Sequence, residues 1–118
     1  MDPRFDLASE DGAAVLRITG DLDIAAEDDA VAAVAAVLAT EPAPAHLVLD
    51  LSAVEFMDSS GLRAVVLADQ KLRAQGLRFA LVRGGEPVHR VFELTRMTDR
   101  LTWVDTPGDL VDGAEERR

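Results

Sequence analysis

The sequence lacks several residue types on which particular kinds of protein chemistry depend. It contains no cysteine and no tyrosine, and Lys71 is its single lysine. Without cysteine the chain can form neither a disulfide framework nor a thiolate metal site. No apolar run approaches the roughly 20 residues of a membrane span, and residues 1–12 do not resemble a signal peptide. We therefore expect a cytoplasmic protein that makes no membrane contact.

Positive charge is also scarce. Twelve Lys and Arg stand against 22 Asp and Glu, which gives a formal net charge of -10. Proteins that bind the phosphate backbone of nucleic acids normally carry clustered Lys and Arg. The balance therefore argues against a direct nucleic-acid partner and favours a basic or mixed protein surface, although acidity also serves solubility alone.

The length and composition fit one compact domain. The chain has 118 residues, of which 48% are hydrophobic and 29% charged, enough to bury a core. We predict a single domain over residues 1–113 and a frayed tail over residues 114–118.

The segment HLVLDLSAVEFMDSSGL, residues 46–62, organises the chain. Leu47, Val48, Leu49 and Leu51 put apolar side chains at both odd and even positions, which is typical of a strand covered on both faces. After a short connection, Asp58 and Ser59 are suited to cap a helix that runs towards Gln75. A helix N-terminus favours an anion, including a phosphate on Ser59. On the local pattern alone a cap and a tight turn are the simpler explanation, and the residues by themselves do not decide the role of Ser59.

The remaining elements follow from alternation, caps and breakers. We predict a hairpin of residues 4–8 and 15–19, a helix capped by Asp23 that stops near Thr40, a strand over 79–82 and a helix from Pro87. Val88, Val91, Phe92 and Thr95 are expected on the inner side of that helix. A last strand over 101–104 and a short capped helix complete the chain. This order predicts an α/β fold with a mixed four- to five-stranded sheet, an edge hairpin and helices packed chiefly on one face.

The sequence offers little for catalysis or metal binding. His46 and His89 have no second ligand at metal spacing, and neither a G-x-S-x-G elbow nor a P-loop is present. The carboxylates of Asp21 and Asp23 are explained by helix capping or by a nucleotide or metal site, and capping is the simpler explanation. We expect no enzyme activity, no metal and no cofactor, and any nucleotide affinity should be weak because few cations are available.

Three segments together resemble the STAS domain family, in particular the bacterial anti-sigma factor antagonists. They are VEFMDSSGL at 54–62, GDLDIAA at 20–26, and GLRFALV with EPVHRVFELT at 76–82 and 86–95. In phosphorylatable members of that family the first serine after the aspartate is the acceptor, which implies Ser59 here. Asp21 replaces the usual glutamate, and Arg96 stands where many relatives have glycine.

The resemblance implies a STAS fold and a partner-switching function. The chain would sequester an anti-sigma factor with serine kinase activity, thereby regulating sigma-factor-dependent transcription, and a PP2C-type phosphatase would reset Ser59. We expect a monomer when the protein is free. The alternative is a STAS regulatory subunit of a transporter or stress-signalling assembly. The expected partner-binding residues are Asp21, Asp23, Asp58, Ser59, Ser60, Gly61 and Arg63.

Overall fold

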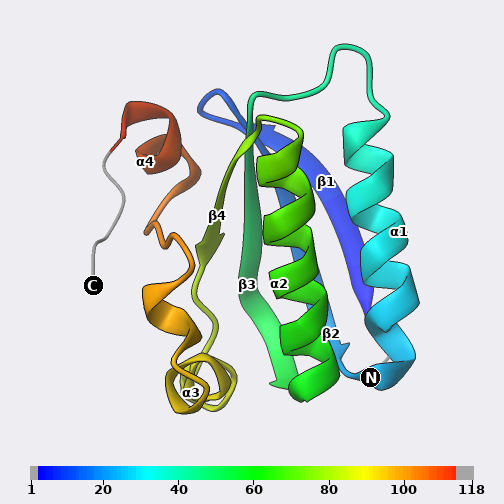
Figure 1. The fold of residues 1–118 in the computed structure, drawn as a ribbon, viewed down its shortest axis with the longest axis vertical. Helices are drawn as coiled ribbons and strands as arrows, with labels where there is room; N and C mark the ends of the chain where they lie inside the picture. Colours follow the sequence, from blue (N-terminus) through cyan, green and yellow to red (C-terminus); the bar gives the residue numbers. More distant parts are fainter. Residues whose placement is uncertain (1–2, 114–118) are drawn as a thin grey trace.

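A four-stranded sheet in the order β1-β2-β3-β4 forms the centre of the computed structural model, which describes residues 3–113 (Figure 1). The predicted frayed tail, 114–118, lies outside the described residues. The elements are β1 (Arg4–Glu10), β2 (Ala13–Leu22), the 3-10 helix η1 (Ile24–Ala26), α1 (Glu27–Leu38), β3 (His46–Met57), α2 (Ser59–Ala74), β4 (Arg78–Val82), α3 (Glu86–Leu94), the 3-10 helix η2 (Met97–Asp99) and α4 (Pro107–Asp112).

The first two strands form the predicted edge hairpin. β1 and β2 pair antiparallel from Arg4 with Thr19 to Glu10 with Ala13. The two connecting residues, Asp11 and Gly12, have φ angles of 52° and 87°, as the tight two-residue turn of a hairpin requires. The turn residues in the sequence therefore fix the register of this edge.

The next strands are parallel, and β3 is longer than predicted. β2 pairs with β3, and β3 with β4, in the parallel sense. We expected a strand over 47–51 and then a connection, but β3 continues to Met57. The reason is that the end of β2 pairs with residues 53–57 across two register shifts, so the sheet supplies hydrogen bonds to this backbone.

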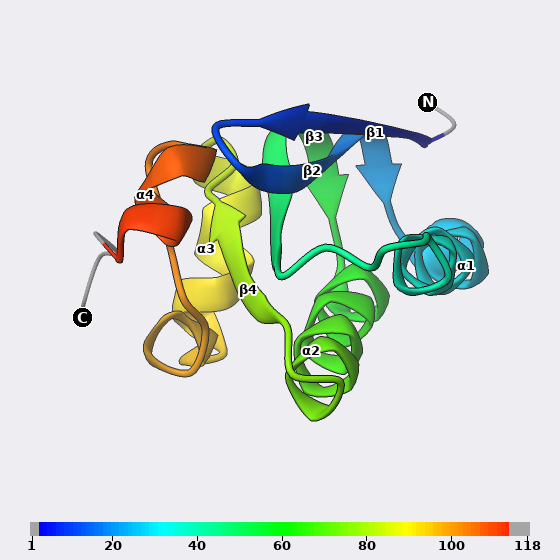
Figure 2. The same ribbon diagram turned by 90° about the horizontal axis from the view of Figure 1, so that it is seen from above.

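The two faces of the sheet carry separate cores. Leu47, Leu49 and Leu51 belong to a large core with residues of α1, α2 and α3. Val48 belongs to a smaller core on the other face, where Leu110 of α4 packs. Figure 2 shows α1 and α2 together on one side of the sheet and α4 apart from them. β3 has apolar side chains at both odd and even positions because both of its faces are covered. The helices pack chiefly on one face of the sheet, as predicted.

The predicted fifth strand does not form. In residues 101–104 only Trp103 bridges to β4, at Leu81. Trp103 lies in the large core whereas Val104 lies in the smaller one, so this segment crosses the sheet edge instead of running along it. It then enters α4, where Asp109 accepts a hydrogen bond from the Thr106 N–H at 3.2 Å, as predicted for a capped helix.

The inner side of α3 differs from the prediction at two positions. Val88 and Phe92 are buried, but Thr95 is exposed because α3 ends at Leu94. His89 is buried instead and meets Trp103 edge-on, with ring centroids 4.8 Å apart. Aromatic pairs favour this arrangement, so His89 is part of the core.

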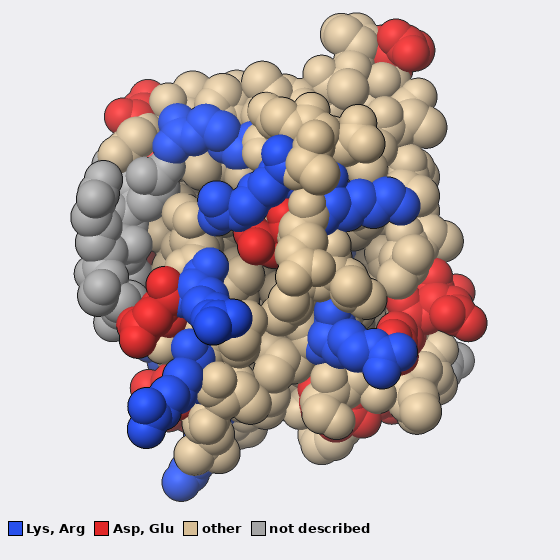
Figure 3. All heavy atoms as spheres, viewed as in Figure 1, with Lys and Arg blue, Asp and Glu red and all other residues tan. Residues whose placement is uncertain are grey.

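Charge is divided unevenly along the chain. Residues 63–100 carry eight Lys and Arg and four Asp and Glu, whereas residues 1–62 carry two and 13. Figure 3 shows Lys and Arg gathered on the face viewed in Figure 1, in the region of α2 and α3. Over the described residues, no helix combines the length and the apolar character needed to cross a membrane.

Arg96 adopts a backbone conformation that favours glycine. Its φ is 60° and its ψ is 26°, in the left-handed region, where it links α3 to η2. A side chain with a Cβ is disfavoured there by roughly 1 to 2 kcal/mol. The turn therefore closes as it would with glycine, but under strain.

We expect Arg96→Gly to raise the free energy of unfolding by about 1 kcal/mol, because relief of strain exceeds the added freedom of the unfolded chain. Arg100→Gly is the matched control. Arg100 is also exposed but has a φ of -95°, so glycine should lower stability there. Chemical denaturation of the three proteins tests this, and destabilisation by both changes would contradict the strain.

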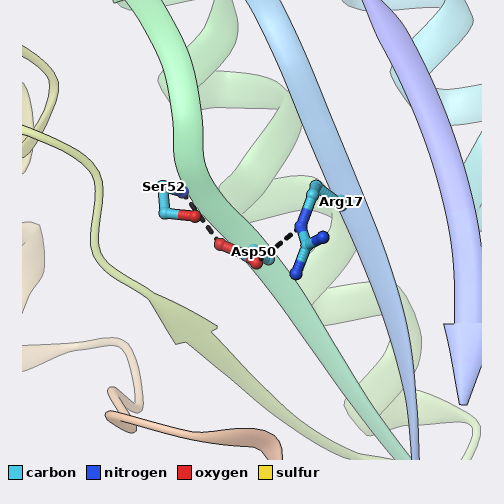
Figure 4. A network of polar contacts seen from close by, with 3 residues as sticks. All are labelled: Arg17, Asp50 and Ser52. Atoms are coloured by element: carbon cyan, nitrogen blue, oxygen red, sulfur yellow. Dashed lines mark hydrogen bonds and ion pairs between the residues drawn. The ribbon is translucent and has the colours of Figure 1, made fainter. Parts of the chain in front are cut away.

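A polar network lies in the sheet between β2 and β3 (Figure 4). Asp50, which is buried, accepts hydrogen bonds from Arg17 Nε at 3.0 Å and from the Ser52 N–H at 2.9 Å. Burial raises the pKa of Asp50, but the hydrogen bonds from Ser52 and Arg17 and the Arg17 charge outweigh it, so the pKa lies below its ordinary value. The hydrogen bond to Asp50 in turn raises the pKa of Arg17.

This network predicts a pH dependence of stability. Because the pKa of Asp50 is lower in the folded state, ionised Asp50 stabilises the fold above the unfolded-state pKa of about 3.9, and this stabilisation is lost as pH falls through the folded-state value. Asp50→Asn should therefore be less stable than the wild type at about pH 7, with the difference shrinking as pH falls below about 3.9. Urea unfolding across this range measures it.

Asp6→Asn is the control for this change. Asp6 pairs with Arg4 at 2.9 Å, but both side chains are more than half exposed, and such pairs contribute about 0 to 1 kcal/mol. Equal pH profiles for Asp50→Asn and the wild type would remove Asp50 from the pH dependence.

Candidate functional site

The ends of β2 and β3 bring two sequence motifs to one edge of the sheet. Leu22 pairs with Met57 in the parallel register, so the GDLD segment at 20–23 lies beside the DSSG segment at 58–61. The Asp58 N–H donates to the Leu22 carbonyl oxygen at 3.4 Å. This edge, at the carboxyl ends of parallel strands, is where α/β sheets commonly place their binding sites.

Asp58 caps α2 and Ser59 is the first residue of the helix. The Asp58 carboxylate accepts hydrogen bonds from the N–H groups of Ser60 at 2.9 Å and Gly61 at 3.2 Å. The cap predicted for Asp58 and Ser59 together is thus made by Asp58, because its carboxylate satisfies the unpaired N–H groups of the first turn. Ser59 is left exposed at the helix N-terminus, and Ser60 is half-buried.

Gly61 allows α2 to start against the end of β2. A Cβ at this position would collide with the Leu22 carbonyl oxygen and would lie 2.7 Å from Met57 Cγ. Since the backbone carbonyl cannot move without disturbing the β2–β3 pairing, only glycine fits. The glycine of the motif therefore sets the position of Ser59.

Asp23 and Asp21 have different settings. Asp23 caps η1, with its carboxylate accepting from the Ala25 N–H at 3.1 Å. We expected Asp23 to cap the long helix directly, but η1 intervenes and Ala26 is the N-cap of α1. Asp21 pairs with Phe56 next to a register shift and is half-buried. Both acids lie on the serine edge, and capping accounts for Asp23.

Arg63 lies one turn into α2 and forms an ion pair with α1. Its Nη2 is 3.2 Å from Glu27 Oε1, and the Arg63 side chain is 71% exposed whereas that of Glu27 is 19% exposed. The pair holds the first turns of α1 and α2 together beside Ser59. Most of the Arg63 side chain remains open to a partner.

Sequence reasoning missed two apolar side chains at this edge. Ile24 in η1 is 75% exposed, and Phe56 near the end of β3 is 52% exposed. Each lies beside one of the motifs, since Ile24 follows Asp23 and Phe56 precedes Asp58 by two residues. Large exposed apolar side chains are informative when they gather near polar groups, and their place inside the GDLDI and VEFMD segments was the available signal.

The surroundings of Ser59 are carboxylates and exposed apolar side chains. His46 begins β3 and Ser59 follows its end, so about 35 Å of strand separates them. His89 is enclosed by the core near Trp103. Within residues 3–113 no group of three or more His, Asp or Glu side chains is arranged to hold a metal ion. The site presents a hydroxyl at a helix N-terminus between carboxylates and exposed apolar groups.

The fold and this edge define a small α/β domain that presents an accessible serine at a helix N-terminus. Comparison with known families gives it a more specific place: the model of the STAS domain matches residues 4–110, and the chain belongs to this family.

Individual relatives agree with this assignment. RsfB of Mycobacterium tuberculosis, an anti-sigma-F factor antagonist, is 31% identical over 112 residues, which cover 95% of this chain and 89% of RsfB. An anti-sigma factor antagonist from Mycobacterium paratuberculosis has a TM-score of 0.74 and 28% identity, with 95% and 93% of the two chains covered.

A third comparison concerns the fold alone. The anti-sigma factor antagonist SpoIIAA in its unphosphorylated form has a TM-score of 0.71 and 23% identity, with 94% of this chain and 96% of SpoIIAA covered. SpoIIAA, a Bacillus cell fate determinant, has also been solved in its phosphorylated form.

We expect Gly61→Ala to destabilise the fold by about 2 kcal/mol, although alanine at an ordinary helix position is favoured over glycine by about 1 kcal/mol. The reason is the collision with the Leu22 carbonyl. Denaturant unfolding gives the sign, and nuclear magnetic resonance shifts at Ser59 and Ser60 should report the displaced helix start.

Gly85→Ala is the matched control. The Cβ would meet only Pro87 Cδ, at 3.9 Å, so its cost should be limited to the weaker N-cap, a few tenths of a kcal/mol to about 1 kcal/mol. A gain in stability for Gly61→Ala would contradict the close contact.

Proposed function

We propose that this chain is an anti-sigma factor antagonist that binds an anti-sigma factor through the serine edge and is switched off by phosphorylation of Ser59. The observation that carries the proposal is the exposed Ser59 at the N-terminus of α2, held there by the Asp58 cap and the Gly61 contact. Two relatives of this chain are anti-sigma factor antagonists, which supports an anti-sigma factor as the partner.

The proposed contact surface combines polar and apolar groups. Exposed Ile24 and Phe56 would supply buried area, while Arg63 and the carboxylates would supply orientation, because charged groups at an interface mainly set specificity and rate of association. The full set of proposed partner-binding residues is Asp21, Asp23, Ile24, Phe56, Asp58, Ser59, Ser60, Gly61 and Arg63.

Phosphorylation would change this surface without unfolding the domain. A phosphoserine adds a charge of about -1.5 to -2 at pH 7. The N-terminus of α2 favours an anion by about 0.3 to 1 kcal/mol, which offsets repulsion by the neighbouring Asp58. In a closed interface the phosphate must lose water against a surface shaped for a hydroxyl, and an imperfectly paired buried charge costs several kcal/mol.

The partners in this proposal perform the chemistry. The anti-sigma factor acts as the serine kinase, a PP2C-type phosphatase removes the phosphate, and this chain itself is not an enzyme. Sequestration of the anti-sigma factor releases a sigma factor for transcription. The setting of Ser59 supports this division of roles, since His46 lies at the other end of β3 and His89 is buried against Trp103.

We expect phosphorylated Ser59 and Ser59→Asp to bind the anti-sigma factor at least about 100-fold more weakly than the wild type, with little change in thermal stability. Ser59→Ala should bind like the wild type and should resist inactivation by the kinase. Calorimetric titration against the cognate anti-sigma factor, together with thermal melts, measures both properties.

Ser9→Asp provides a control with the same added charge. Ser9 is exposed in β1 next to the hairpin turn, at the opposite end of the sheet, so this variant should retain full affinity. Equal affinity of the phosphorylated and unmodified proteins would remove Ser59 from the mechanism, and loss of affinity in Ser9→Asp would point to net charge alone.

A further inference from the structure

The helix α1 is apolar on every side over residues 30–39, AVAAVAAVLA. A helix of this kind is normally buried on all faces. Here Ala30, Val34 and Val37 face the core, but Figure 2 shows α1 at the margin of the molecule, with no other element on its outer side. The exposed residues of this stretch are Val31, Ala32, Ala35, Ala36 and Ala39.

A groove between α1 and α2 continues this apolar face. It has a volume of about 430 Å³, and Val31 and Leu67 lie on it with exposures of 43% and 45%. Its other lining residues are Val34, Ala64, Ala68, Gln70 and Lys71. Lys71 is the one charged side chain in this lining, so the groove has a cation at one end.

Beyond the other end of the groove lie Asp28 and the Glu27–Arg63 ion pair, which together carry a net negative charge. Asp28 and Lys71 lie at similar distances from the middle of the groove. Glu27 of α1 and Arg63 of α2 form an ion pair across the two helices. Val31 and Leu67 lie four residues further along their helices and line the same groove. Asp28 lies three residues before Val31, and Lys71 four residues after Leu67. At 1.5 Å per residue these offsets are about 4.5 Å and about 6 Å along the helix axes.

These charges face the same way as the apolar side chains beside them. Asp28 and Val31 are spaced i, i+3, and Leu67 and Lys71 are spaced i, i+4, so each pair shares a helix face. Asp28 is exposed, as is Lys71. The α1–α2 face therefore has an apolar centre between Lys71 at one end and Asp28 at the other, where Arg63 is paired with Glu27.

We infer that this α1–α2 face pairs two copies of the chain around a two-fold axis at the level of Val31 and Leu67. The axis reverses the helices of the second copy, so each Lys71 meets Asp28 of the other copy, while Val31 and Leu67 meet at the centre. A two-fold interface must be self-complementary, and this arrangement of charge is. The alanines of α1 allow the helices to approach closely.

The α1–α2 face adjoins the serine edge at Arg63, which lies one turn before Leu67, while Ser59 lies a further turn away. The dimer departs from the free monomer that the sequence leads us to expect, and it is independent of the proposed binding at Ser59. Measurement of mass in solution decides between monomer and dimer.

The first test is sedimentation of the full chain over rising concentrations. The average mass should increase from 12.7 kDa towards twice that value. Val31→Asp, which places two like charges at the axis, should weaken association at least about 10-fold. Leu94→Asp is the control, because Leu94 is 74% exposed on α3 and lies away from this face. Circular dichroism confirms that each variant is folded.

The second test exchanges charges. Asp28→Lys alone and Lys71→Glu alone should each weaken association about 10-fold, because two pairs per dimer become repulsive. A mixture of the two variants should associate like the wild type. In the mixed dimer the two introduced side chains, of opposite charge, face each other, and the native Lys71 of one copy faces the native Asp28 of the other. This rescue requires that Asp28 of one copy faces Lys71 of the other.

Several outcomes would overturn the proposal. A wild type that stays at 12.7 kDa at every concentration excludes the dimer, and a mixture no stronger than its components excludes the reversed orientation. If Val31→Asp loses anti-sigma factor binding while the wild type is monomeric, the face belongs to that partner. Ser59→Asp should dimerise normally, so failure of the switch and failure of the dimer are distinguishable.

Discussion

The contact between Gly61 and the Leu22 carbonyl determines the geometry of the whole serine edge. Because Leu22 also pairs with Met57 and accepts from the Asp58 N–H, the end of β2, the end of β3 and the start of α2 meet at one point. A side chain at position 61 would separate them. The exposed hydroxyl of Ser59 is thus located by backbone packing, which is rigid, and its position does not depend on the rotamer of any long side chain.

The residues of the two motifs at the serine edge form two groups: those that contact the backbone of this chain and those that face solvent. The carboxylates of Asp58 and Asp23 accept hydrogen bonds from backbone N–H groups of α2 and η1, and Gly61 provides space, so these residues build the edge. Ser59, Ile24 and Phe56 face solvent and are available to another molecule. A substitution at a building residue changes stability and geometry together, whereas one at an exposed residue leaves the geometry of the edge in place. Experiments on the site therefore need both readouts.

Local sequence signals predicted where most helices and strands lie. The full length of β3 and the path of residues 101–104 depend on contacts between segments that are far apart in the sequence. Alternation and the Asp-Gly turn were sufficient for the hairpin, and the apolar run and Asp58 were sufficient for β3 and α2. The continuation of β3 to Met57 depends on the neighbouring end of β2, which lies more than 30 residues earlier. Residues 101–104 have the composition of a strand but cross between two cores. The Arg63–Glu27 ion pair and the exposure of Ile24 and Phe56 follow from tertiary packing, which no local pattern encodes.

The uneven division of charge gives the molecule an electric dipole in addition to its net charge. The acidic first half includes the hairpin and α1, while the cations gather in the region of α2 and α3. In the field of a charged surface such a molecule experiences a torque, so it is oriented before it makes contact with that surface. The direction of approach is therefore selected over distances of about a Debye length, roughly 8 Å at physiological salt. Collisions in solution then sample the orientations of this domain unequally, and added salt makes them more uniform.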